Sequence, residues 1–211
     1  MTLQERADAI REILHREFPN PKPELKYNSD KPYEFLFAVM LSAQCTDKMV
    51  NRVTDSLFRK YTSLDDYCSA TEEEFCKDIK SIGLCRVKAR NILATARMLR
   101  DQYDSKVPQK MEDLLKLPGV ARKTANVVLG QLFGINEGIA VDTHVKRLAK
   151  ALGLTKHDDP GKVEQDLMKV IPRNEWNTFS LQLILYGRHR WPARTNTHDG
   201  PLAPFVVKPN G

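Results

Sequence analysis

The sequence predicts an all-α protein. Apolar residues recur at three- and four-residue intervals along most of its 211 residues, and no stretch sustains the strict alternation of a half-buried strand. Proline and glycine fall between these amphipathic stretches, where they end one helix before the next. We expect a proline-rich loop over 19–32 and helices over 3–18, 33–43, 47–60, 71–80, 86–103, 111–116, 121–133, 143–152, 160–170 and 174–188.

The composition indicates a folded protein without a membrane partner. Hydrophobic residues make up 41% and charged residues 28% of the chain, which suits a globular protein rather than a disordered tail. No apolar run approaches the roughly 18 residues that cross a bilayer, and the N-terminus does not resemble a targeting peptide. We expect an intracellular protein of the cytoplasm or nucleoid, or of the nucleus or mitochondrion if the source is eukaryotic.

The cysteines do not predict a metal site. Cys45, Cys68, Cys76 and Cys85 contain no Cys-x-x-Cys pair, so neither zinc nor a cluster built from these four is expected. The favoured hypothesis is free thiols in a reducing compartment.

The distribution of basic residues indicates a nucleic-acid partner more clearly than the net charge of +6 or the isoelectric point of about 9.1. Residues 86–100 of one predicted helix carry five bases and no acid, which a solvated charged face would also explain. Six more bases follow in 116–150, against only Glu137 and Asp142. Together they favour duplex binding by counterion release, and they are Arg86, Lys88, Arg90, Arg97, Arg100, Lys116, Arg122, Lys123, Lys146, Arg147 and Lys150.

Two predicted hairpins lie among these bases. IGLCRVKA (82–89) and PGVARKTA (118–125) share glycine, arginine and alanine at a constant offset of 36, which we interpret as one turn geometry used twice. Gly119 is expected to adopt a positive φ. The helix that follows begins with N–H groups that lack intrahelical partners and suit a phosphate oxygen. The alternative is a plain helix–helix corner in the core.

Lys123 and Asp142 are the candidate catalytic residues. Lys123 follows Arg122 at the start of the helix over 121–133, and both the helix dipole and Arg122 should lower its pKa. A neutral amine is a nucleophile that can form a Schiff base, although an exposed surface lysine is the alternative. Asp142 stands where an N-cap would, and its carboxylate could also stabilise a cation and move protons.

Across roughly residues 5–190 the sequence resembles the helix-hairpin-helix DNA glycosylases, specifically the endonuclease III family. The resemblance implies two helical lobes with a cleft, one formed by 25–136 and the other by 1–24 with 137–211, and it places Lys123 and Asp142 on opposite walls. The matching segments are ELKYNSDKPYEFLFAVMLSAQCTD, SIGLCRVKARNI, LPGVARKTANVVL, AVDTHVKR and LQLILYGR.

The resemblance implies excision of oxidised or ring-saturated pyrimidines from duplex DNA by a monomer. Lys123 would attack C1′ and support β-elimination at the abasic site, whereas relatives that only remove bases lack this lysine. Gln44 and Leu84 match residues that enter the duplex as a base flips. Alternatively, Leu84 is a core leucine and LSAQCTD is a polar turn capped by Asp47. The other residues expected to contact DNA are Gly119, Val120, Ala121, Arg122 and Arg86. The residues expected to line the pocket for the base are Ser42, Asp47 and His144.

The sequence leaves two other functions open. A monofunctional glycosylase would remove uracil or thymine from mismatches, and a non-catalytic module would only bind DNA of a particular structure. The family hairpin usually reads Gly-x-Gly, whereas this chain has Ala121 at the second glycine. We expect modestly altered contact with DNA.

The C-terminus departs furthest from the family. Many members hold a [4Fe–4S] cluster with four C-terminal cysteines. Residues 187–211 of this chain contain no cysteine, and Trp191 stands where the first of the four is expected. Because such clusters need thiolate ligands, no iron–sulfur cluster is expected. His189 and His198 alone are too few to bind another metal, so no other cofactor or metal is expected either. Apolar packing should substitute for the cluster, and the residues expected to supply it are Trp191, Leu202, Phe205 and Val206. Basic residues that can face DNA remain in the tail, and they are Arg188, Arg190, Arg194 and Lys208.

Overall fold

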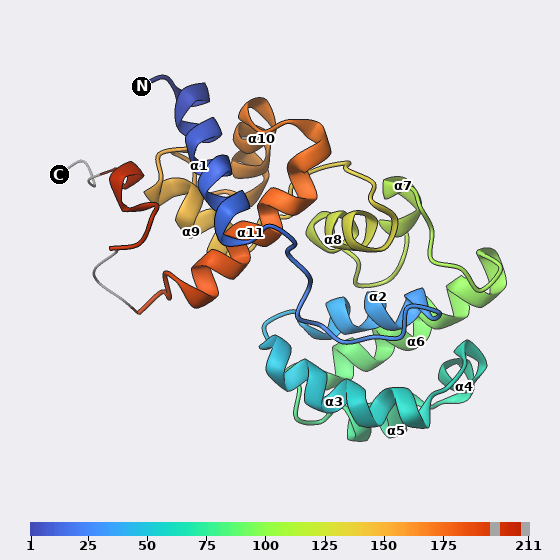
Figure 1. Ribbon diagram of the computed structural model, residues 1–211. Coiled ribbons are helices and arrows are strands. Elements are labelled where there is room, and N and C mark those ends of the chain that lie inside the picture. The colour runs from blue at the N-terminus through green and yellow to red at the C-terminus, as the bar shows by residue number, and fades with distance from the viewer. Residues whose placement is uncertain (195–198, 208–211) are drawn as a thin grey trace. The chain divides into compact units, whose positions relative to one another are not determined.

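The computed structural model describes residues 1–194 and 199–207, and in these ranges every regular element is a helix (Figure 1). His198 and Lys208 lie outside the described residues. None of the described helices has the length and apolarity to cross a membrane. The chain divides into two compact units. We call Pro23–Ile135 the hairpin unit, and Met1–Lys22 with Asn136–Gly211 the terminal unit.

The hairpin unit is built around one helix that is buried on all sides. Every residue of α2 from Glu34 to Leu41 is buried, and α2 packs against α3, α6 and α8. A helix that is apolar all round belongs in a core. The buried Glu34 carboxylate accepts a hydrogen bond from the Asn28 N–H at 2.9 Å. The helices of this unit are α2 (Pro32–Leu41), α3 (Asp47–Lys60), α4 (Leu64–Ser69), α5 (Glu72–Asp78), α6 (Cys85–Gln102), α7 (Met111–Leu114) and α8 (Arg122–Phe133).

Helix α6 confirms one part of its sequence interpretation and corrects another. The predicted stripe of Ala89, Ile92, Ala96 and Leu99 is fully buried. Lys88, however, is not one of the surface bases that the composition predicts, because its side chain is only 7% exposed. Helix α4 was not predicted, because six residues are too few to show a helical period.

The terminal unit packs the N-terminal helix against the last long one. The buried face of α1 lies against α10 and α11, and the Gln182 side chain of α11 donates to the Phe18 carbonyl at 2.9 Å. Its elements are α1 (Leu3–Glu17), α9 (Thr143–Ala151), α10 (Pro160–Val170), α11 (Trp176–His189) and two 3₁₀ turns, Arg173–Glu175 and Ala203–Phe205.

The C-terminal segment is held by apolar packing and by arginine contacts with its backbone. Leu202 is fully buried in the core of the terminal unit, and Trp191 and Phe205 pack against that core. The Arg147 guanidinium lies 5.4 Å from the Trp191 ring and donates to its carbonyl. Val206, which was expected to join this packing, is instead 38% exposed. Three of the four residues expected to pack together, Trp191, Leu202 and Phe205, therefore do so.

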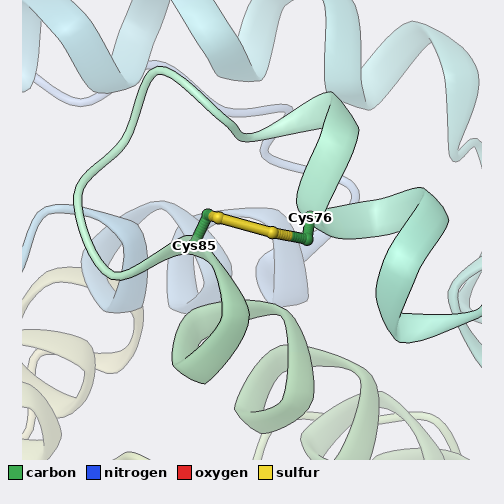
Figure 2. Close-up of a disulfide and its surroundings, with 2 residues drawn as sticks. All are labelled: Cys76 and Cys85. Atoms are coloured by element: carbon green, nitrogen blue, oxygen red, sulfur yellow. A yellow bond between two sulfur atoms is a disulfide. The ribbon is translucent and has the colours of Figure 1, made fainter.

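Two of the four cysteines are joined in a disulfide (Figure 2). The bond links Cys76 of α5 to Cys85, the first residue of α6, with Cα atoms 5.2 Å apart. The hypothesis of four free thiols was therefore wrong for this pair and is confirmed for Cys45 and Cys68. The bond closes a short segment that contains Leu84.

The contact between α1 and the start of α11 depends on Glu175. Its carboxylate accepts a hydrogen bond from Arg11 Nε at 2.9 Å and lies 3.0 Å from His15 Nε2. Hydrogen bonding to the Arg11 guanidinium, the largest cause, lowers the pKa of Glu175. A carboxyl whose pKa is lowered on folding stabilises the protein above its unfolded pKa of about 4.3.

Glu175→Gln should therefore lower the free energy of unfolding by about 1.5–3 kcal/mol at pH 7, the range of a hydrogen bond to a charged group. The difference from wild type should shrink as pH falls below about 4.3, because the unfolded carboxyl then takes up a proton before the folded one does, and it should vanish once the folded carboxyl is protonated too. Urea denaturation at pH 7, 5 and 3.5 measures it, with exposed Glu12→Gln as the control. A deficit that does not change with pH would contradict this account.

Candidate active site and nucleic-acid interface

The second predicted hairpin is a tight turn held on α6. Gly119 has φ +80°, as expected, and a Cβ at this position would lie 2.6 Å from Asn91 Nδ2. The Thr95 hydroxyl donates to the Pro118 carbonyl at 3.1 Å. Both the backbone conformation and the close approach to α6 therefore require glycine.

Helix α8 begins at this hairpin with two cations. Arg122 is its first residue, Lys123 follows, and the first turn contains no acid. Ala121 is the N-cap and makes no side-chain capping bond. The first N–H groups of a helix have no intrahelical partners, so this end of α8 combines dipole, backbone donors and cations where an anion can bind. Ala121, Arg122 and Lys123 are all exposed.

Val120 does not suit its predicted contact with DNA. Its side chain is only 6% exposed, and its N–H already donates to the Leu117 carbonyl at 3.1 Å. Val120 therefore anchors the hairpin in the core of the hairpin unit. Gly119 and Ala121, on either side of it, are the exposed positions.

The first hairpin has a different backbone, so the interpretation of one turn geometry used twice was wrong. The left-handed residue here is Leu84, with φ 61° and ψ 34°, whereas Gly83 has no positive φ and a Cβ on it would meet nothing within 4 Å. Leu84 is 58% exposed, while its counterpart Val120 is buried. The alternative of a core leucine is thereby excluded. One hairpin presents an apolar side chain to solvent, and the other presents its backbone.

Gln44 lies at the tip of the turn between α2 and α3. It is exposed and has φ 57°. Ser42, in the same turn, is half-buried and donates its hydroxyl to the Val39 carbonyl at 2.8 Å. The cap of α3 is Thr46, whose side chain accepts from the Met49 N–H, and not Asp47 as the alternative hypothesis had it. Among the described residues, the non-glycine residues with positive φ are Gln44, Leu84, Asp104 and Ser105.

Asp142 is the N-cap of α9 in the terminal unit. Its Oδ1 accepts a hydrogen bond from the Val145 N–H at 2.8 Å, which confirms the capping prediction and fixes the carboxylate at the start of the helix. His144, in the first turn of α9, packs on Gly187, where a Cβ would lie 2.8 Å from His144 Nδ1. Burial lowers the pKa of His144.

Several bases that were expected to form the DNA surface have structural partners instead. Lys116 pairs with Asp113 at 2.8 Å, and Lys150 pairs with Asp158 at 2.6 Å. Arg147 holds the C-terminal segment, and Lys88 is buried. Arg100 pairs with Asp101. Composition alone therefore overestimated the DNA-facing charge, while Arg86 and Arg90 remain exposed on α6.

Comparison with known proteins defines the class. Residues 37–173 match the HhH-GPD superfamily base excision DNA repair protein family. Endonuclease III of Synechocystis sp. is 47% identical over 191 residues, which cover 90% of this chain and 86% of the relative. The structure of a non-covalent endonuclease III–DNA complex aligns with a TM-score of 0.90 and 43% identity, over 98% of this chain and 96% of that one.

A trapped covalent endonuclease III–DNA intermediate, described as an estranged-adenine complex, aligns with a TM-score of 0.89 and 44% identity, over 98% and 96% of the two chains. The chain belongs to the endonuclease III family. It is a DNA glycosylase with abasic-site lyase activity, as the resemblance implied.

Gly119→Ala should damage the hairpin, because alanine would have to hold a positive φ and displace Asn91. We expect a loss of about 1–3 kcal/mol in unfolding free energy and weaker binding of undamaged duplex. Gly83→Ala is the matched control, since a Cβ there meets nothing within 4 Å. Chemical denaturation and fluorescence anisotropy measure the two effects. Equal behaviour of the two variants would refute the assigned difference between the hairpins.

Proposed function

We propose that this enzyme removes oxidised or ring-saturated pyrimidines from duplex DNA and then nicks the abasic site. Lys123 is the nucleophile and Asp142 the assisting carboxylate. The observation that carries this assignment is an exposed lysine in an acid-free first helical turn, directly after a hairpin suited to phosphate. The trapped covalent complex of a 44% identical relative supports a covalent route.

The amine of Lys123, once neutral, attacks C1′ of the damaged nucleoside. The C1′–N-glycosidic bond breaks, and the base leaves with the bonding electrons and takes up a proton. Opening of the sugar at the C1′–O4′ bond converts the amine adduct into an imine. Loss of a proton from C2′ then expels the 3′-phosphate, and water releases the enzyme from the imine.

The carboxylate of Asp142 stabilises the positive charge that develops on the sugar and on the imine, and it relays protons between the amine and the ring oxygen. Its position as N-cap supports this role, because the bond to Val145 N–H uses Oδ1. A capping bond also keeps the side chain in one rotamer, so the second oxygen has a fixed direction.

Duplex binding combines backbone donors with two inserted side chains. The exposed hairpin at Gly119 and Ala121 binds a phosphate, with Arg122 and Arg86 adding charge. Gln44 and Leu84 enter the DNA duplex beside the flipped nucleotide. Unstacking that nucleotide costs about a few kcal/mol, and the inserted side chains offset part of this cost. Their exposure and left-handed backbone support this assignment. All these groups come from one chain, so we propose that the monomer is active.

The enzyme works without an iron–sulfur cluster. The residues present do not fit one, because 187–211 has no cysteine, and a [4Fe–4S] cluster needs thiolate ligands. The described part of the chain also contains no group of three or more His, Cys, Asp or Glu residues placed to hold a metal ion. Packing of Trp191, Leu202 and Phe205 stabilises the C-terminal segment instead.

Borohydride trapping tests the catalytic pair. Wild type should form a covalent product with duplex containing a single oxidised pyrimidine, and Lys123→Gln should abolish it. Asp142→Asn should slow base release by a factor of about 10²–10⁴ while it retains the N-cap, since asparagine caps as well as aspartate. Asp159→Asn, at the N-cap of α10, controls for loss of a capping charge and should be active.

Other outcomes would identify the rival functions. Base release from uracil or thymine mismatches without trapping in wild type would indicate a monofunctional glycosylase. Binding of damaged duplex with no base release, even at high enzyme excess, would indicate a non-catalytic module.

Leu202→Ala tests the substitute for a cluster. Truncating this fully buried leucine should cost about 2–5 kcal/mol of stability, whereas exposed Val206→Ala should change it by no more than about 0.5 kcal/mol. Thermal and urea unfolding measure both variants. Elemental analysis of the purified wild type should find no stoichiometric iron. Iron in the amount that one [4Fe–4S] cluster per chain requires would disprove the proposal that the enzyme lacks a cluster.

A further inference from the structure

Lys88 is a buried cation in contact with the turn that carries Gln44. Its Nζ donates to the Leu41 carbonyl at 2.8 Å and to the Ala43 carbonyl at 2.6 Å. The side chain is only 7% exposed, and burial lowers the pKa of Lys88. Buried amines are costly unless they are hydrogen-bonded, so a role in holding these carbonyls would explain the position of this one.

The Ala43 carbonyl belongs to the peptide group that enters Gln44. Rotation of that peptide plane changes φ of Gln44, since the plane is rigid and φ is the next free torsion. A non-glycine residue in the left-handed region is strained and persists only where its surroundings fix it. The bond from Lys88 Nζ supplies such a restraint next to the strained residue.

The backbone of Lys88 restrains the other inserted residue. Its N–H donates to the Leu84 carbonyl at 3.0 Å, the first hydrogen bond of α6. Leu84 is also left-handed and exposed. One residue thus contacts the backbone next to Gln44 through its side chain and Leu84 itself through its main chain.

We infer that Lys88 is a positioning residue that holds Gln44 in register with Leu84, so that both can enter duplex DNA together. This inference rests on the proposed roles of Gln44 and Leu84. Lys88 acts through the Ala43 carbonyl and not by contact with the substrate or the reacting atoms. Loss of the Lys88 amine should therefore weaken binding only to duplex DNA, where Gln44 and Leu84 have to insert between the two strands.

The test compares wild type with Lys88→Met, Gln44→Ala and the double variant. Methionine keeps the length and apolar body of the side chain and removes the amine. The probe for binding is a duplex with one tetrahydrofuran abasic-site analogue, measured by anisotropy. The probe for chemistry is borohydride trapping on abasic DNA, either duplex or single-stranded. Lys110→Met, an exposed lysine of the same unit, controls for the loss of one positive charge.

Lys88→Met should weaken binding to the abasic duplex about tenfold, similar to Gln44→Ala, and the double variant should be no weaker than Gln44→Ala alone. Trapping on single-stranded abasic DNA should stay at the wild-type rate, because no opposite base has to be displaced. Lys110→Met should bind like wild type. A 2-aminopurine base placed opposite the analogue should become more fluorescent when wild type binds and unstacks it. This increase should be lost with Lys88→Met and with Gln44→Ala.

Each contrary result is distinct. If Gln44→Ala weakens duplex binding and Lys88→Met does not, the inference fails while the proposed function stands. If Lys88→Met lowers trapping equally on single-stranded and duplex DNA, Lys88 supports the fold generally and the inference fails. If effects of the two substitutions add, Lys88 does not act through Gln44. If Gln44→Ala itself has no effect, the proposed role of Gln44 and this inference fall together.

Discussion

The polar stripe Lys88, Asn91 and Thr95 on helix α6 is the feature on which the candidate DNA-binding surface of the hairpin unit depends. These residues follow the i, i+3, i+7 spacing that places side chains on one helix face. Lys88 bonds the turn before α3, Asn91 packs on Gly119, and Thr95 bonds the Pro118 carbonyl. The apolar stripe of the same helix is buried in the core. Loops that are far apart in sequence are thereby fixed to one rigid element, and their spacing becomes a property of α6.

Two of the four described non-glycine residues with positive φ are the residues of the proposed insertion. Gln44 and Leu84 both have left-handed backbones, a conformation that costs a non-glycine residue about 1 kcal/mol or more. A backbone that already holds these side chains out in solvent does not have to rearrange when they enter a duplex, so strain accepted on folding reduces the cost of binding. The disulfide between Cys76 and Cys85 closes the segment that contains Leu84. Preorganisation therefore accounts for both the unusual torsions and the contacts that maintain them.

The sequence predicted those features that depend on local periodicity and on backbone chemistry. The long helices, the positive φ of Gly119 and the capping by Asp142 follow from apolar spacing, from the missing side chain and from the short acceptor before a helix. Features set by tertiary contacts could not be predicted in this way. Lys88 looks like one more base on a charged helix until the carbonyls of a distant turn are placed beside it. The sulfur pairing of Cys76 likewise depends on how α5 meets α6.

Helix α9 of the terminal unit, like α6 of the hairpin unit, fixes proposed functional residues and contacts other segments of its own unit. Its N-cap supplies the Asp142 carboxylate, and two residues later His144 packs on Gly187 of α11. Arg147, on the same short helix, donates to the Gly187 and Trp191 carbonyls and so connects α9 to the C-terminal segment. A nine-residue helix has little rigidity of its own. The apolar packing around Trp191 and Leu202 therefore also restrains, through Arg147, the helix that positions the proposed catalytic carboxylate.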